Sequence, residues 1–256
     1  MNPSPPTQPP SSSQLDILCA GAMHPVMDEL IGALERIAGR PVMVQFASSG
    51  GVSARVMAGE AADVVITTAA AMDDLGRHDR ILLMTVTAVA RSAIGVAVRA
   101  GAARPDIGSV ESFKRALRDA RSIAIADPAT GSPSGNHIVA VLERLELTTE
   151  LEGKIRRIGG GTGGVVVVGD AVASGEVEIG IQQVAEILAV PGLDMVGELP
   201  GELQHVTVFS AAVAATATDL PPAHRVVAFL ASSQAAAVIR AKGMEAAEAE
   251  CGQLTR

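Results

Sequence analysis

The chain has 256 residues, of which 48% are hydrophobic, but only four are aromatic, all phenylalanine, with no tryptophan or tyrosine. A chain of this length buries a substantial core in one domain or in two lobes. That core must be built from aliphatic side chains, as in parallel α/β sheets. The formal net charge of −8 argues against a nucleic-acid partner, which would need a basic face.

The first fourteen residues, MNPSPPTQPPSSSQ, contain five prolines, four serines and no charged side chain. This composition predicts a disordered leader over residues 1–14, because a signal peptide needs a basic start and an apolar stretch. No segment has the length and apolarity of a membrane span, so no membrane insertion is expected. As the chain stands, the expected location is cytoplasmic; a true start further upstream would make the protein periplasmic.

From Leu15 onward, short apolar runs alternate with amphipathic ones. The expected elements are, in order, a strand at 15–21, a helix at 24–39, a strand at 41–47, a loop and short helix at 48–60, a strand at 62–68 and a helix at 69–78. In the first helix the apolar residues recur at helical spacing and Gly39 follows its last turn. This β-α alternation predicts a parallel sheet with helices on both faces.

A long β-branched run at 85–101 interrupts the alternation and is expected to cross from one lobe to the other. The elements expected after it are a helix at 109–120, strands at 121–127 and 177–183, helices at 134–147 and near 165–175, a short helix after residue 183, a second long strand at 204–215, and helices at 221–232 and 234–244. We therefore predict one lobe from 15–85 and 206–244, a second lobe from 86–205, and a solvated tail at 245–256. Ligands of such folds bind between the lobes, at strand ends and helix starts.

The segment DPATGSPSGNH, at 127–137, places turn residues directly before an amphipathic helix. Ser134 is predicted to cap this helix. The first turn of a helix leaves backbone N–H groups without partners inside the helix, and these groups can hold an anion. An ordinary loop with an N-cap is the alternative.

Four segments together carry a resemblance to a known family. They are CAGAM at 19–23, FASSGGVSARVMAGEAADVVIT at 46–67, DPATGSPSGNH at 127–137 and GEVEIGIQQVAEI at 175–187. In this order they resemble the type II periplasmic binding-protein fold, and more narrowly the molybdate-binding (ModA-like) branch of bacterial solute-binding proteins, over residues 15–244. The resemblance implies two α/β lobes, each a mostly parallel sheet flanked by helices, joined by two crossover strands. It also implies a small anionic ligand, and an ABC-transporter permease as partner if the protein is exported.

In that branch, serine hydroxyls and backbone N–H groups at helix starts hold the oxyanion, often with a tyrosine hydroxyl. The positions that match here are Ala22 and Met23, Ser48 and Ser49, Ser134 and Gly135, and Gln183. Alanine stands where the family has its first serine, and glutamine stands where it has the tyrosine. These departures favour a small organic carboxylate over molybdate or tungstate. Arg91 and Thr162 are further candidates for ligand contact, although a solvent-facing arginine and a plain glycine-rich loop are the alternatives.

An aconitate isomerase is similar to this branch, so isomerisation of an unsaturated polycarboxylate is the alternative function. It requires a base to remove an allylic proton and an acid to return one. The candidates are His137, His24 and Glu186. Each has a structural alternative: His24 as a helix start, His137 as a solvated first-turn residue, and Glu186 as an acid favoured by the helix dipole. An intracellular sensing module is a third hypothesis.

The remaining motifs predict neither a cofactor nor a metal. The glycine-rich stretch near residue 160 has Val165 where a phosphate-binding loop needs lysine, which argues against nucleotide binding. The five histidines show no metal-binding spacing, and Cys19 and Cys251 form no close-spaced pattern. A disulfide between the two cysteines stays open, but a buried, unreactive thiol at Cys19 is favoured.

Overall fold

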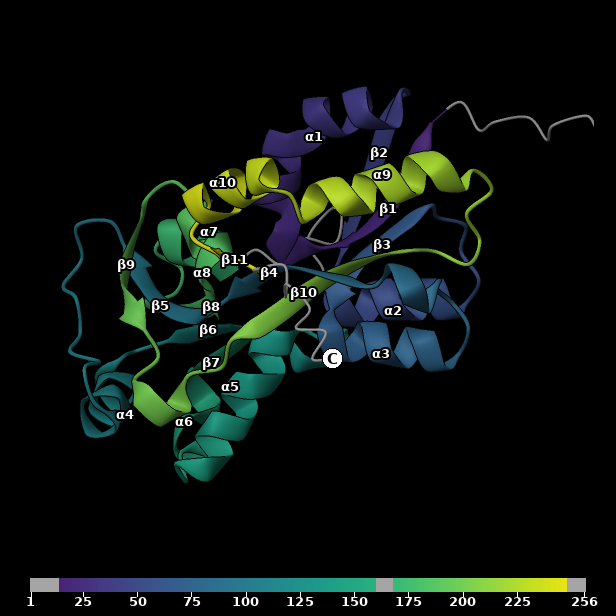
Figure 1. The fold of residues 1–256 in the computed structure, drawn as a ribbon. Coiled ribbons are helices and arrows are strands. Elements are labelled where there is room, and N and C mark those ends of the chain that lie inside the picture. Colours follow the sequence, from purple (N-terminus) through teal and green to yellow (C-terminus); the bar gives the residue numbers. More distant parts are fainter. Residues whose placement is uncertain (1–13, 160–167, 248–256) are drawn as a thin grey trace, which may run out of the picture.

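The computed structural model describes residues 14–159 and 168–247 of the chain, which form two mixed β-sheets flanked by helices (Figure 1). The six-stranded sheet of the first lobe has the order β11-β4-β10-β3-β1-β2. Its strands are β1 (Leu15–Ala20), β2 (Val42–Ala47), β3 (Val64–Thr68), β4 (Thr87–Ser92), β10 (Thr207–Val213) and β11 (Glu245–Ala246). The five-stranded sheet of the second lobe has the order β7-β6-β8-β5-β9. Its strands are β5 (Ile94–Arg99), β6 (Ile123–Ala126), β7 (Ile155–Ile158), β8 (Ile179–Gln183) and β9 (Leu193–Glu198).

Helices cover both faces of each sheet. Those of the first lobe are α1 (His24–Ala38), α2 (Ser49–Met57), α3 (Ala69–Arg77), α9 (Leu220–Leu230) and α10 (Ser233–Ala241). Those of the second lobe are α4 (Val110–Asp119), α5 (Pro133–Arg144), α6 (Thr148–Leu151), α7 (Val168–Ala173) and α8 (Val184–Leu188). Short 3-10 turns connect several elements: η1 (Gly21–Met23), η2 (Leu83–Thr85), η3 (Pro128–Thr130), η4 (Glu152–Lys154) and η6 (Gly201–Leu203). Within the described ranges, no helix combines the length and apolarity that crossing a membrane requires.

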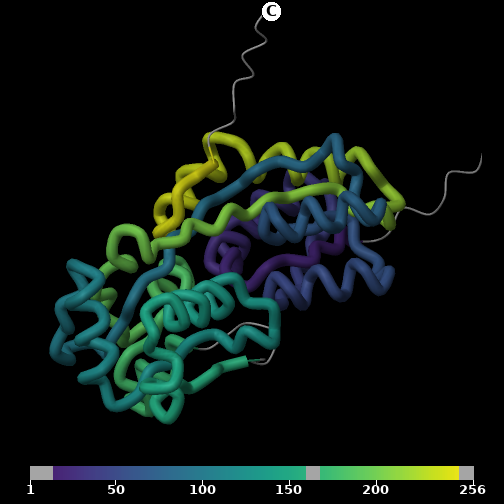
Figure 2. Tube along the Cα trace, turned by 90° about the horizontal axis from the view of Figure 1, so that it is seen from below, coloured from purple at the N-terminus to yellow at the C-terminus, as the bar shows by residue number. Residues whose placement is uncertain are grey.

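Two crossings join the lobes, as Figure 2 shows from below. The first passes from β4 to β5 through the single residue Ala93, and the second passes from β9 to β10 through residues 199–206. Strands β1, β2 and β3 pair in parallel, as do β6, β7 and β8. The strands next to the crossings pair antiparallel, β10 with β3 and β4, and β5 with β8 and β9. The chain therefore has the two-lobed α/β architecture with two crossover strands that the resemblance implied.

The sheets divide the chain differently from the predicted boundaries at two places. The run at 85–101 was expected as one crossing strand, but it breaks at Ala93, and its first half pairs with β10 and β11 in the first sheet. Residues 86–92, expected in the second lobe, thus include a strand of the first. Glu245–Ala246, expected in the solvated tail, pairs with β4 as an edge strand. Residues 1–13 of the predicted leader, Thr162 and residues 248–256 of the predicted tail lie outside the described residues.

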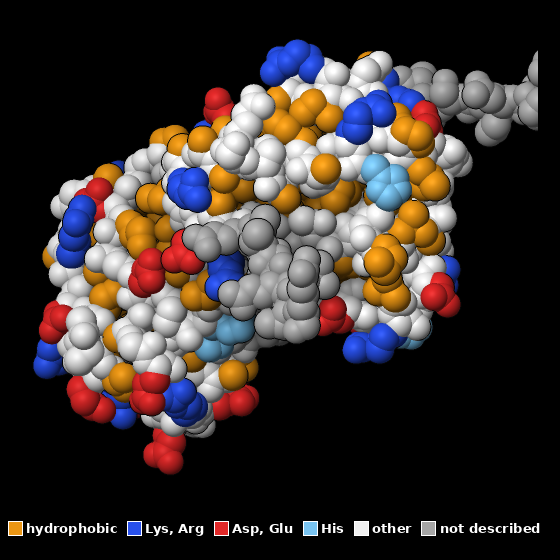
Figure 3. Space-filling view, viewed as in Figure 1, with side chains coloured by type: hydrophobic (Ala, Val, Ile, Leu, Met, Phe, Trp, Pro, Cys, Tyr) orange, Lys and Arg blue, Asp and Glu red, His pale blue; other side chains and the backbone are white. Residues whose placement is uncertain are grey.

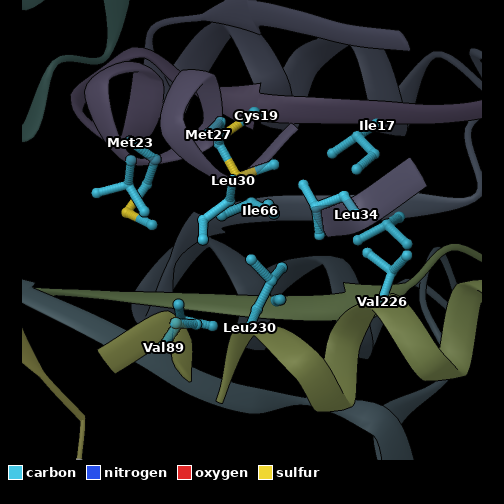
Figure 4. Packing of buried hydrophobic residues seen from close by; sticks show 14 of the residues in the cluster. Ile17, Cys19, Met23, Met27, Leu30, Leu34, Ile66, Val89, Val226 and Leu230 are labelled. Atoms are coloured by element: carbon cyan, nitrogen blue, oxygen red, sulfur yellow. The ribbon is translucent and has the colours of Figure 1, made fainter. Parts of the chain in front are cut away.

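The core of the first lobe forms between β1 and the helices α1 and α9 (Figure 4). Met27, Leu30 and Leu34 of α1 recur at helical spacing and are almost fully buried, as the periodicity predicted. Each such side chain contributes about 1.5–3 kcal/mol on burial. Cys19 lies in this core, where burial raises the pKa of its thiol well above the ordinary value. This lobe holds the start of α2, which is one of the two helix starts described next.

Candidate functional site

A small cavity of about 20 Å³ lies between the lobes, where parallel strands end and helices begin. Its lining from the first lobe is Gly21, Ala22, Ser48, Ser49 and Phe209; its lining from the second is Ser132, Pro133, Ser134, Gln183 and Glu186. This volume is enough for about one water molecule. Neither lysine nor arginine is among these described lining residues.

Two helix starts from different lobes meet at this cavity. In α2, the side chain of Ser48 caps the helix by accepting a hydrogen bond from the N–H of Gly51 at 3.0 Å. In α5, the cap is Ser132, which accepts from the N–H of Gly135 at 3.4 Å. Because first-turn N–H groups and the positive end of the helix dipole point out of each helix start, both helices favour an anion in the cavity.

The cap of α5 corrects one sequence prediction. Ser134 was expected at the cap, but it lies in the first turn, fully buried, with its Oγ 3.3 Å from the Oγ of Ser132. The signal that identifies Ser132 is Pro133, since proline is favoured at the first helical position and its cap directly precedes it. Ser132, together with Gly21 and Phe209, is a lining residue that the sequence prediction missed.

Direct contacts between the lobes close the cavity. The N–H of Gly50 donates to the carbonyl of Gly131 at 3.2 Å, and the hydroxyl of Ser48 donates to the carbonyl of Thr130. The backbones approach so closely that a Cβ on Gly50 would lie 2.7 Å from the Cα of Gly131. Gly131 also has a φ of 70°, a conformation that favours glycine. The structure is thus the closed form of the two-lobed molecule.

Gln183 lines the cavity but its amide is bound to both crossings. Its nitrogen and oxygen are satisfied together when the oxygen accepts from Thr207 Oγ1 at 2.9 Å and the nitrogen donates to Ser92 Oγ at 3.0 Å. The nitrogen also lies 3.2 Å from the carbonyl of Ala93. Gln183 therefore connects the first crossing to the second, in addition to facing the cavity.

Glu186 places a carboxyl group in the same cavity. Burial raises its pKa to about 7, although hydrogen bonds from the side chain of Gln182 and the N–H of Gln183 oppose this shift. A raised folded-state pKa gives stability that is fully present below about pH 4.5 and is lost as the pH rises through 7. Among the candidates for acid–base chemistry, Glu186 is the one that lies in the cavity.

The two predicted histidines lie elsewhere. His137 directs its Nε2 to the carbonyl of Leu203 at 2.8 Å and stacks on the ring of His205, with ring centres 5.0 Å apart. His24 packs edge-on against Phe46 and lies 3.4 Å from Asp28, in a groove on another side of the molecule. The geometry therefore does not support either ring as a base in the cavity.

Of the other residues that were predicted to contact the ligand, some line the cavity and others do not. Ala22 lines the cavity, whereas Met23 is fully buried in the core of the first lobe. Arg91 is exposed on β4 opposite Glu245, away from the cavity. Gly135 is the residue whose N–H reaches Ser132. In the two described ranges, no group of three or more His, Cys, Asp or Glu is placed to hold a metal ion.

The fold and this site define a two-lobed protein that encloses a small ligand between its lobes. The chain belongs to the bacterial extracellular solute-binding protein family, whose model matches residues 15–245. It is 31% identical over 242 residues to an aconitate isomerase from Pseudomonas sp., covering 92% of this chain and 89% of the relative.

Solved structures share the fold at lower identity. The periplasmic molybdate-binding protein of Azotobacter vinelandii is 20% identical with a TM-score of 0.71, over 90% of this chain and 98% of that one. The sulfate-binding protein of Mycobacterium tuberculosis is 18% identical with a TM-score of 0.72, over 91% and 86%. These likenesses confirm the two-lobed architecture.

Proposed function

We propose that the cavity binds a small anion, with a small organic carboxylate favoured, and that the protein is the solute-binding component of an ABC transporter. One observation carries this proposal: the capped starts of α2 and α5 bring the hydroxyls of Ser49, Ser132 and Ser134 to one cavity between the lobes, while the hydroxyl of Ser48 donates to the carbonyl of Thr130. Oriented hydroxyl and N–H donors stabilise an enclosed anion through charge-assisted hydrogen bonds, without a cationic side chain.

The composition of the lining supports a carboxylate. A tetrahedral dianion needs donors on all sides, but Ala22 contributes no hydroxyl and the amide of Gln183 is bound to the crossings. A carboxylate has two oxygens in one plane, so fewer donors satisfy it. On the face shown in Figure 3, positively and negatively charged side chains are mixed. We therefore assign recognition of the ligand to the groups that line the cavity.

Thermal unfolding in the presence of molybdate, tungstate, sulfate and di- or tricarboxylates tests the proposal. A ligand at about a hundred times its Kd stabilises the folded state by about 2.7 kcal/mol, which raises the Tm by about 5–10 °C for a protein of this size. Ser49→Ala and Ser134→Ala should each weaken binding about tenfold or more, since each removes one hydrogen bond to a charged group. Ser233→Ala, at the exposed start of α10, is the matched control. A shift with molybdate and none with carboxylates would overturn the ligand class.

The family description, an extracellular solute-binding protein, supports a location outside the cytoplasmic membrane. A permease as partner belongs to the same proposal. Fractionation of the native host tests this part of the proposal. Protein found only in the cytoplasm would contradict a transport role and favour an intracellular sensing module instead.

Isomerisation of an unsaturated polycarboxylate is the second candidate. The cavity position of Glu186 and the 31% identity to an aconitate isomerase favour it. In this mechanism the ionised carboxyl takes a proton from a carbon next to the double bond, the double bond moves by one position, and the protonated carboxyl returns the proton to its far end. Ultraviolet absorbance of aconitate isomers tests it: Glu186→Gln should abolish turnover, whereas His137→Ala should keep it. Binding without turnover in the unaltered protein would exclude the enzyme.

A further inference from the structure

Glu186 is the one ionisable side chain among the described residues that line the cavity. It lies in the first turn of α8, three residues beyond Gln183, and it receives hydrogen bonds from the side chain of Gln182 and the backbone N–H of Gln183. The other polar lining residues, Ser48, Ser49 and Ser132 among them, are uncharged. The closed form therefore encloses one acid and no base.

We propose that anion binding in this cavity takes up one proton, which Glu186 carries, so that the bound anion faces a neutral carboxylic acid. This inference rests on the proposed anion binding and adds a proton to the species that binds. It makes Glu186 a specificity-determining residue: the site favours ligands that present an acceptor oxygen to it.

The reason is electrostatic. An ionised Glu186 and an anion in the same small cavity would repel each other in a medium of low dielectric constant, with no cationic side chain in the lining to offset the repulsion. A protonated Glu186 removes the repulsion and gives the ligand an O–H donor. The hydrogen bonds from Gln182 and Gln183 can remain, because the second carboxyl oxygen still accepts them.

The closed form is already poised for this uptake before a ligand binds. With a pKa of about 7, Glu186 gains a proton at neutral pH far more easily than an exposed glutamate does. An anion beside it raises that pKa further. Ligand binding above pH 7 must then take a proton from solution. Below about pH 6, Glu186 is already protonated, so binding needs no further proton.

No other titratable group competes for this role in the described part of the cavity. The charged and titratable groups that line a groove with α8 are His24, Asp28, Glu29 and Lys242, and the strands packed against α8 add Arg99 on β5 and Asp194 and Glu198 on β9. His24, Asp28, Glu29 and Lys242 line the separate outer groove, and none of the seven contributes to the shift of the pKa of Glu186.

Calorimetric titration at pH 8 in two buffers with different ionisation enthalpies measures the proton uptake directly. The probes are sulfate, molybdate, acetate and tartrate, because none of them changes charge between pH 6 and pH 8. The unaltered protein should take up about 0.9 proton at pH 8, and its Kd should be about tenfold higher at pH 8 than at pH 6. Equal heats in both buffers, with binding intact, would overturn this inference and leave the proposed function standing.

Glu186→Gln provides the second readout, because its amide is neutral at every pH. The ratio of Kd at pH 8 to that at pH 6 should fall from about ten to about one. Glu176→Gln, an exposed glutamate before β8, should keep the ratio of the unaltered protein. A pH dependence that persists in Glu186→Gln would contradict the assignment. If no probe binds the unaltered protein, both the proposed function and this inference fail. Proton uptake with a polycarboxylate would also exclude Glu186 as the base of an isomerase.

Discussion

Gly50→Ala is expected to weaken ligand binding about a hundredfold or more. The added Cβ would lie 2.7 Å from the Cα of Gly131 and 2.8 Å from the carbonyl oxygen of Thr130, both backbone atoms of the opposite lobe. Backbone cannot give way as a side chain end can, so the lobes must separate. The donors of α2 and α5 would then no longer reach the same anion. Losing two hydrogen bonds to a charged ligand costs about 3 kcal/mol, or about a hundredfold in affinity.

Calorimetry and small-angle scattering check this prediction together. When ligand is added, Gly50→Ala should keep the radius of gyration of the ligand-free protein, which is larger than that of the closed form. Its unfolding temperature without ligand should change little, because the clash lies between the lobes. Gly32→Ala in α1 is the control, since the nearest atom to its Cβ is a terminal guanidinium nitrogen of Arg36 at 3.9 Å. Binding by Gly50→Ala at the affinity of the unaltered protein would show that the ligand-bound form is more open than this structure.

The element order and the architecture were predictable because local patterns determine them. The apolar residues of α1 lie on one face at helical spacing, and Gly39 ends the helix with a φ of 74°. The serine-rich turns and the segment at 175–187, which contains Glu186, could be placed by resemblance. Ser48, Ser49, Ser134, Gln183 and Glu186 all line the cavity in the structure. These residues lie where strands end, and the sequence pattern indicates where the strands end.

The sequence prediction missed the break at Ala93, although Ser92 and Gly95 lie close to it. Both residues are inside strands in the structure, Ser92 at the end of β4 and Gly95 in β5, so neither forms a turn there. What satisfies the backbone there is distant in sequence: the carbonyl of Ala93 accepts from the N–H of Val184 at 2.9 Å and from the amide of Gln183. Partners from another element override the local preference for one continuous strand.

The histidines show a different limit. His137 is three residues after Ser134 in α5, so spacing puts both on nearby faces of the helix. Each residue advances the helix by about 1.5 Å, however, and three residues carry the ring about 4.5 Å away from the helix start. At that distance from the helix start, the ring of His137 contacts the carbonyl of Leu203 and does not reach the cavity. Helical spacing predicts a face, but not which neighbour a side chain contacts.

Gly135→Ala is expected to destabilise the protein by about 3 kcal/mol and to lower its Tm by about 10 °C. The added Cβ would lie 2.2 Å from the carbonyl oxygen of Ala126 and 3.0 Å from its carbonyl carbon, so the first turn of α5 must move off β6. That movement also lengthens the hydrogen bond from the N–H of Gly135 to Ser132. Stability and anion binding should fall together, because the start of α5 belongs to both the packing and the cavity.

Urea unfolding measures this effect against Gly153→Ala, in which the added Cβ meets no atom within 4 Å. The control should change stability by less than about 1 kcal/mol, since it adds a methyl group without a clash. The contrast between the two variants separates a steric cause from any general effect of removing glycine. If Gly135→Ala unfolded at the same urea concentration as Gly153→Ala, α5 would not pack this closely on β6. The first turn of α5 would then no longer be part of the proposed anion site.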